Sequence, residues 1–314
     1  MALVVNTNIA SMNAQRSLAA NTNDMKTAME RLSTGKAINS AADDAAGFAI
    51  SETMTAQIRG LSMAAKNSSD ALGLLKVVEN ATNDVTDMLQ RIRELAVQAN
   101  SGTNSTGDIA NLQKEAEALM DEIERVSQDT TYNNQAYLGA GADALTGGQV
   151  KIQVGYNDGD VIDVGVYNIH TGNLGHRSVD AVTGAVTFAS DTANESLTWD
   201  DTGVKKYLDI TLQQTVDGTG AVTAPGALQV ISDAITQVAS YKAEWGALQN
   251  RLEYTVSNLM NVVEFTSAAR SRIQDADFAV EAANLAKAQV LQQTGTAMLA
   301  QANAAPQLAL QLLK

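Results

Sequence analysis

The sequence contains no cysteine, and aromatic residues make up only 4% of its 314 residues. Without cysteine the chain can form no disulfide bond, thiolate nucleophile or thiolate metal site. Hydrophobic residues of all kinds reach 45%, but with so few aromatics they provide little material for a large globular core. This composition favours helices that pack closely through small side chains.

Basic residues are scarce relative to acidic ones, with 21 Lys and Arg against 35 Asp and Glu and a net charge of −14. Nucleic acid is therefore not an expected partner, because phosphate binding needs a basic surface. The first residues lack the basic segment and long apolar run of a cleavable signal peptide. No window approaches the ~18 apolar residues of a membrane span. Taken alone, these two absences favour a cytoplasmic protein, unless export depends on an uncleaved terminus.

A heptad repeat of apolar residues near the end of the chain is the strongest structural signal. The first series is Ile231, Val238, Trp245, Leu252, Leu259, Thr266 and Ile273. The series three residues on is Ala234, Tyr241, Leu248, Thr255, Val262, Ala269 and Ala276. Such a narrow stripe is buried by another helix rather than by a globular core. We therefore expect a rod of roughly 60 Å that pairs with a helix from the other end of the chain.

The first part of the chain is predicted to be helical as well. Apolar periodicity indicates a helix over residues 1–34 that ends at Gly35, where glycine can take the left-handed conformation. A small and polar connector follows, and Asp43-Asp44 suits the cap of the next helix better than paired catalytic carboxylates. Further helices are expected over residues 45–99 and 108–128, separated by a Gly, Ser and Asn cluster.

Between the helical arms, residues 139–227 are rich in glycine and acidic residues. Alternating polarity predicts strands over residues 150–154 and 161–166, joined by a hairpin turn at residues 156–160. Two later strands are expected over residues 185–189 and 207–213. The predicted fold class is mainly α with a β insertion, in which long terminal helices form a coiled coil and an antiparallel helical bundle.

Residues that could carry chemistry are few, and no catalytic constellation or cofactor site is expected. His170 and His176 do not fit the zinc-protease pattern His-Glu-x-x-His. With Asp180 they could bind a metal, but we favour exposed loop residues. A faint likeness to a calcium loop lacks the terminal bidentate Glu, so a hairpin turn is favoured there. The aspartates concerned are Asp158, Asp160 and Asp163.

Several long motifs at both ends resemble those of bacterial flagellins. At the N-terminal end they are residues 5–8 (VNTN), 30–35 (ERLSTG), 38–47 (INSAADDAAG) and 90–98 (QRIRELAVQ). At the C-terminal end they are residues 269–277 (ARSRIQDAD), 286–293 (AKAQVLQQ) and 299–303 (LAQAN). Their number and order favour a structural, non-enzymatic subunit of the flagellar filament.

The resemblance implies a domain organisation and a set of partners. Residues 1–44, which include the connector, and residues 276–314 correspond to an inner coiled-coil domain. Residues 45–138 and 228–275 correspond to the next helical shell, and residues 139–227 to a β-rich hairpin and a small variable region. Implied partners are further copies of the chain, an export chaperone, and the hook–filament junction and cap proteins. The implied location is the extracellular filament, reached through the flagellar secretion channel without a cleaved signal. Both ends are expected to be disordered or weakly helical in the monomer and to become ordered on polymerisation.

Three residues match positions that enteric flagellins present to the animal innate receptor for flagellin: Arg91, Leu95 and Glu115. In the family these positions are buried between subunits, so subunit packing is their first expected role and receptor binding would require free monomer. From the residues alone, a solvated helix face explains the charged ones. Candidate O-glycan acceptors in the middle segment are Ser178, Ser190 and Thr192.

Three alternatives remain open at this point. The nearest is a hook–filament junction protein with flagellin-like termini, although the density of motifs at both ends favours the main filament. An adhesin or secreted enzyme that uses such ends for export is disfavoured by the short and histidine-poor middle. A cytoplasmic coiled-coil scaffold would be eliminated by export that depends on the N-terminal segment.

Overall fold

The computed structural model describes residues 8–139, 149–171, 174–175, 178–179, 186–187, 197–201, 204–213, 215–216, 222–224 and 226–312. The chain divides into two units. The terminal unit consists of Met1–Gly60 and Asn261–Lys314, and the central unit consists of Leu61–Met260. No helix among the described residues is both long enough and apolar enough to cross a membrane.

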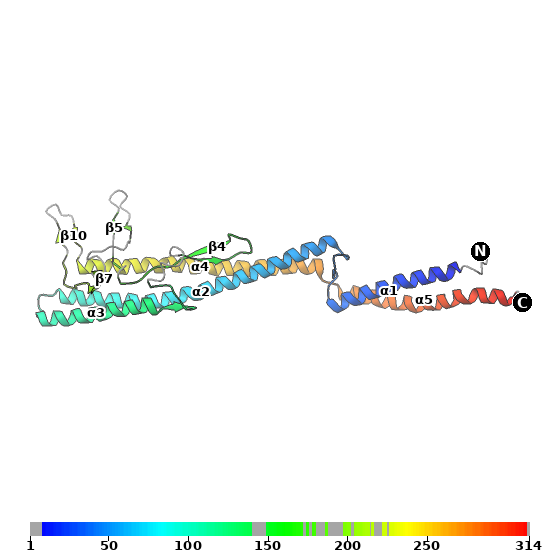
Figure 1. The fold of residues 1–314 in the computed structure, drawn as a ribbon, viewed down its shortest axis with the longest axis horizontal. Coiled ribbons are helices and arrows are strands. Elements are labelled where there is room, and N and C mark those ends of the chain that lie inside the picture. The colour runs from blue at the N-terminus through cyan, green and yellow to red at the C-terminus, as the bar shows by residue number, and fades with distance from the viewer. Residues whose placement is uncertain are drawn as a thin grey trace. The chain divides into compact units, whose positions relative to one another are not determined.

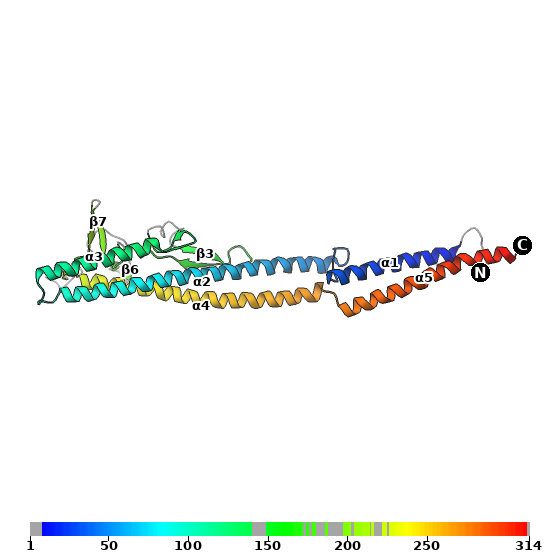
Figure 2. The same ribbon diagram turned by 90° about the horizontal axis from the view of Figure 1, so that it is seen from below.

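In the terminal unit, α1 (Ile9–Thr34) and α5 (Phe278–Leu312) lie side by side (Figures 1 and 2). Helix α1 begins at Asn8, whose side chain accepts a hydrogen bond from the Ser11 N–H. It ends at Gly35, which has a φ of 71° and donates its N–H to the Arg31 carbonyl. The helix therefore ends where the sequence predicts, at a glycine that takes the left-handed conformation without strain.

The connector after α1 is held by the two aspartates of the sequence motif. Asp44 Oδ1 accepts the N–H groups of Ala46 and Gly47, both at 3.1 Å. It therefore satisfies donors that the first turn of α2 (Ala45–Ala99) leaves unpaired, which confirms the expected cap. The Asp43 carboxylate accepts hydrogen bonds from the Ser40 and Asn39 N–H groups, and these bonds lower its pKa.

Three helices form the frame of the central unit, where α2 is joined by α3 (Thr106–Asp129) and α4 (Ala227–Gln274). Both views show α3 alongside α2. Helices α2 and α4 are antiparallel, since Glu79 bonds Gln249 and Asn83 bonds Lys242. The helix predictions for residues 45–99 and 108–128 are confirmed to within two residues.

Among the described residues, five two-stranded antiparallel ladders follow α3. The first joins β1 (Thr131–Tyr132) to β2 (Gln135–Ala136), and the second joins β3 (Gln149–Gln153) to β4 (Val161–Gly165). The others are β5 (Ser178–Val179) with β6 (Val186–Thr187), β7 (Thr198–Asp201) with β8 (Val204–Tyr207), and β9 (Thr215–Val216) with β10 (Val222–Ala224). The β3–β4 pair confirms the predicted hairpin.

Of the two other strand predictions, one is wrong and one is confirmed only at two residues. The strand expected over residues 207–213 is wrong, because β8 ends at Tyr207 and a turn follows. In that turn Asp209 Oδ1 accepts the Thr211 N–H at 2.9 Å, and the Leu212 N–H bonds the Asp209 carbonyl at 3.0 Å. Of the strand expected over residues 185–189, only Val186–Thr187 is a strand, and the rest lies outside the described residues.

The heptad seam of α4 is buried over most of its length. Its fully or almost fully buried members are Ile231, Val238, Trp245, Leu252 and Leu259, whereas Ile273 is half-buried. Ala276 lies beyond the end of α4 at Gln274 and so is not part of the stripe. At Trp245 the expectation that a helix alone covers the stripe is wrong, because the indole N–H bonds the Gly165 carbonyl of β4 at 3.0 Å.

The core of the central unit is shared between the helices and the insertion. Fully buried side chains come from α2, α3 and α4 and also from the segments around Ile169, Leu174, Leu197 and Leu208. The ends of the insertion are therefore part of the core rather than a separate outer domain.

Candidate assembly surface

The α1–α5 pair buries few of its own side chains. Among the described side chains of the two helices, the buried ones are Ser11, Ala28, Glu281 and Ala288. Large apolar side chains of the pair are instead 47–65% exposed: Ile9, Met12, Met29, Phe278, Val280, Val290, Leu291 and Met298. Exposed apolar area of this extent marks a surface that other protein covers.

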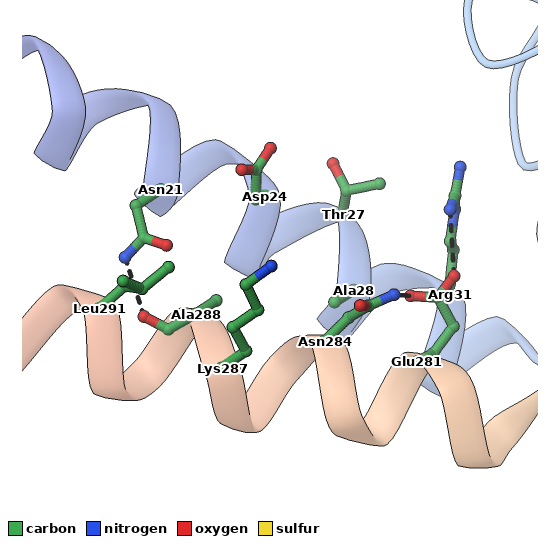
Figure 3. A pocket seen from close by; sticks show the side chains of 10 residues that line it. All are labelled: Asn21, Asp24, Thr27, Ala28, Arg31, Glu281, Asn284, Lys287, Ala288 and Leu291. Carbon is green, nitrogen blue, oxygen red and sulfur yellow. Dashed lines mark hydrogen bonds and ion pairs between the residues drawn. The ribbon is translucent and has the colours of Figure 1, made fainter.

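The groove between the two helices is apolar along one part of its length and polar along another. Its apolar part has a volume of about 440 Å³ and includes Leu18, Leu291 and Met298. Its polar part, of about 430 Å³, is shown in Figure 3 and includes Arg31, Glu281 and Lys287. The pair thus offers both an apolar and a charged surface to a neighbour.

Side chains that cross from α1 to α5 hold the pair antiparallel. The Asn8 amide donates to the Ala302 carbonyl and the Asn21 amide to the Ala288 carbonyl, both at 2.8 Å. Arg31 Nη1 lies 3.0 Å from Glu281 Oε1. Arg31 Nε is buried and has no hydrogen-bond partner among the described residues. No local pattern in the sequence pairs these residues with one another, because only the register of the two helices brings them together.

Two of the three expected subunit and receptor contacts meet on the surface. Arg91 Nη2 lies 2.8 Å from Glu115 Oε1, and Arg91 Nη1 lies 3.0 Å from Glu94 Oε2. Hydrogen bonds from Arg91, first to Glu115 and then to Glu94, raise its pKa above the ordinary value. Leu95 is fully buried in the chain's own core. It therefore lies beneath this surface rather than on it.

The histidine and aspartate candidates fall in different places. His170 is not the exposed loop residue that was favoured, because its Nε2 lies 2.6 Å from Glu124 Oε1 and it is half-buried. His176 and Asp180 lie outside the described residues. Asp160 accepts the Asn157 N–H, as expected for a hairpin turn. Within the described part of the chain, no group of three or more His, Asp and Glu side chains could hold a metal.

The candidate glycan acceptors cannot be located: Ser190, Thr192 and the side chain of Ser178 lie outside the described residues.

Comparison with known proteins decides the family. A family model described as the bacterial flagellin N-terminal helical region matches residues 5–142, and one described as the C-terminal helical region matches residues 228–313. A flagellin of Halalkalibacterium halodurans is 39% identical over 312 residues, covering 99% of this chain and 100% of the relative. The chain belongs to the bacterial flagellin family. A Bacillus subtilis flagellin is also 39% identical, over 317 residues and 99% of both chains.

Among solved structures, a Bacillus cereus flagellin aligns with a TM-score of 0.42 and 22% identity, covering 62% of this chain and 88% of that one. The family is structural, and this flagellin is a structural subunit of the flagellar filament. The alternative of a hook–filament junction protein has no better support, because the full-length relatives compared above are flagellins. Self-polymerisation is the activity that the family implies.

Proposed function

We propose that the α1–α5 pair is the element that drives polymerisation. It forms the inner coiled-coil domain from residues 1–44 and 276–314, inside a shell built by residues 45–138 and 228–275. The observation that carries this proposal is the contrast in burial. The central unit has a continuous core that buries most of its large apolar side chains, whereas none of the large apolar side chains described in the terminal pair is fully buried. Burial against neighbouring copies would remove this apolar area from water and stabilise the filament.

The remaining assignments are proposed by analogy with the family. The chain is exported through the flagellar secretion channel without a cleaved signal and is assembled outside the cell. An export chaperone covers the exposed stripe of α5 before export, and the junction and cap proteins contact the chain at the filament ends. The parts of residues 139–227 that do not pack on the helices face solvent in the filament and carry any glycans. The chain has no enzymatic role.

Arg91 and Glu115 are proposed to act first in subunit packing. Their side chains are about half exposed and held together, so they present a preformed charged patch on α2 and α3. Free monomer would offer the same patch to the animal innate receptor for flagellin, with Leu95 packed underneath.

Seeded polymerisation tests the main proposal. The full chain and a chain lacking residues 1–30 and 280–314 are mixed separately with filament fragments and followed by sedimentation and electron microscopy. We expect filaments from the full chain and none from the truncated chain. Far-ultraviolet circular dichroism and urea unfolding of the truncated chain control for loss of the central fold. Equal polymerisation of both chains, with the central unit intact, would contradict the proposal.

A further inference from the structure

We propose that Arg31 and Glu281 determine the register in which α1 pairs with α5, as a specificity pair for assembly. This inference rests on the proposed role of the terminal pair in polymerisation. It begins from the spacing of the contacts along α5. Atoms of α1 meet α5 at Glu281, Ala288, Gly295 and Ala302, which are each seven residues apart.

Three of these four α5 positions carry small residues, which lets α1 approach the backbone of α5. The Asn8 and Asn21 amides reach main-chain carbonyls there. A Cβ atom added to Gly295 would lie 3.2 Å from Leu18 Cδ1, so this approach is close. Every residue has a carbonyl, however, and small residues recur every seven positions. If α5 shifted by seven residues, the same kinds of contact could form again.

The apolar contacts do not remove this ambiguity. The buried apolar residues of the pair are alanines, Ala28 and Ala288, while the large apolar side chains are half-buried or exposed. Backbone bonds also join the ends of the pair, from Ala37 N–H to the Gln274 carbonyl and from Ala276 N–H to the Gly35 carbonyl. Backbone groups hold the ends together but are the same at every residue, so they do not select a register.

Glu281 is the only charged residue of the heptad line, and its side chain is 10% exposed. Arg31 pairs with one of its oxygens and Asn284 bonds the other at 3.4 Å, as Figure 3 shows. A shift of seven residues in either direction would take Arg31 away and leave a largely buried carboxylate without its cation, which is costly. The observed register therefore differs from the registers shifted by seven residues in that it alone pairs Arg31 with Glu281.

The helix dipoles add to this selection. Arg31 lies in the last turn of α1 and Glu281 in the first turn of α5. A cation is favoured at a helix C-terminus and an anion at an N-terminus. Each residue therefore stabilises its own helix end, and their pairing brings these two ends level.

The absence of cysteine makes the register directly measurable. Reporter chains carry Leu18→Cys with Gly295→Cys for the observed register, or with Ala288→Cys or Ala302→Cys for shifts of one heptad. Each is copolymerised as a minor component with excess wild-type chain, so that disulfides between reporter copies are rare. After oxidation, peptide mapping identifies the disulfides formed within one chain. The wild-type reporter is expected to link positions 18 and 295.

Charge reversal then tests the pair. In Arg31→Glu or Glu281→Arg the 18–295 crosslink should fall by about tenfold or more, because the like charges repel in a partly desolvated site. The double exchange should restore it. If the reversed variants fail to join filaments, Glu281→Gln replaces them, because it keeps the shape of the side chain and removes its charge. The 18–295 crosslink should then show an intermediate loss. Arg16→Glu, an exposed reversal on the same helix, is the matched control and should change nothing.

An unchanged 18–295 crosslink in both single reversals would overturn the inference, and so would a loss that the double exchange does not restore. Failure of the polymerisation proposal would give a different result, in the truncation experiment. In that case the truncated chain would form filaments as well as the full chain, whatever the crosslinks show.

Discussion

At the scale of single residues, polar side chains on the helices fix the ends of the insertion. The Gln113 amide donates to the Leu208 carbonyl and accepts the Ile210 N–H, both at 3.1 Å. Further along α3, Glu124 contacts side chains of the insertion instead: its Oε1 lies 2.6 Å from His170 Nε2, and its Oε2 accepts the Thr171 hydroxyl at 2.9 Å. The Gln113 bonds replace strand pairing at Leu208 and Ile210, so these backbone groups remain paired within the core.

Trp245 tests how strongly the insertion is held on α4. Trp245→Ala should lower the free energy of unfolding of the central unit by about 3–5 kcal/mol, through the cavity left by a buried indole. Trp245→Phe should cost about 1–2 kcal/mol, since the Gly165 carbonyl then loses its donor. Urea unfolding followed by circular dichroism measures both. Tyr254→Ala removes an aromatic ring that is 79% exposed and should leave the stability unchanged. Equal effects of Trp245→Ala and Tyr254→Ala would refute this account.

Asp108 gives a pH-dependent prediction. The Ser105 hydroxyl and then the Ser105 N–H, which bond its carboxylate, hold the pKa of Asp108 below its ordinary value of 3.8. A lowered folded-state pKa means that the stabilisation is present above the unfolded value and is lost as the pH falls through the folded one.

Asp108→Asn should therefore lower the unfolding midpoint in urea at neutral pH, and its difference from wild type should vanish in strong acid. The exposed Asp87 of α2 provides the control, and Asp87→Asn should show a much smaller pH-dependent difference. A difference between Asp108→Asn and wild type that is constant with pH would contradict the capping role.

At the scale of elements, Gly175 is a point where the insertion passes close to α4. Its φ is 89°, and an added Cβ would lie 2.7 Å from Val230 Cγ1 and 2.8 Å from the Val230 carbonyl oxygen. Gly175→Ala should therefore destabilise the central unit by about 2–3 kcal/mol, from backbone strain together with the clash. Gly102→Ala has no atom within 4 Å of the new Cβ and should be neutral. Thermal unfolding compares the two, and an unchanged midpoint in Gly175→Ala would show that the contact is not tight.

The helices and the β3–β4 hairpin could be predicted because each has its own local period. Along β4, Ile162 and Val164 are buried while Val161 and Asp163 are exposed, which is the alternation that the sequence displays. The β1–β2 hairpin was missed, although its adjacent Asn133 and Asn134, with φ of 52° and 61°, are a recognisable turn signal.

The failed prediction for residues 207–213 has a different origin. Its residues are apolar enough for a strand, but Asp209 closes a turn and Gln113 satisfies the backbone from another element. The same limit applies to the assembly surface. Arg31 and Glu281 lie 250 positions apart, so their pairing depends on a helix register that no local pattern contains.

At the scale of the whole molecule, the two units differ in how far side-chain burial within each unit can stabilise it without neighbouring copies of the chain. The central unit has a continuous core in which residues such as Leu89, Ile92 and Met120 are fully buried. In the terminal unit, the described side chains of the paired helices bury little beyond two alanines, a serine and a glutamate. Because most helical stability in proteins comes from tertiary packing, the terminal pair on its own should open readily.

Amide hydrogen exchange should reveal this difference. In the monomer, amides of α1 and α5 are expected to exchange within seconds, whereas those around Leu89 and Ile92 of α2 should be protected by the full stability of the central unit. In filaments the α1 and α5 amides should become protected too, because neighbouring copies then cover Ile9, Met298 and the other exposed apolar side chains. The α2 amides serve as the internal control in both samples. Strong protection of α1 and α5 in the monomer would mean that the pair is stable by itself. Polymerisation would then join preformed rods, and the ordering of the ends would no longer be coupled to assembly.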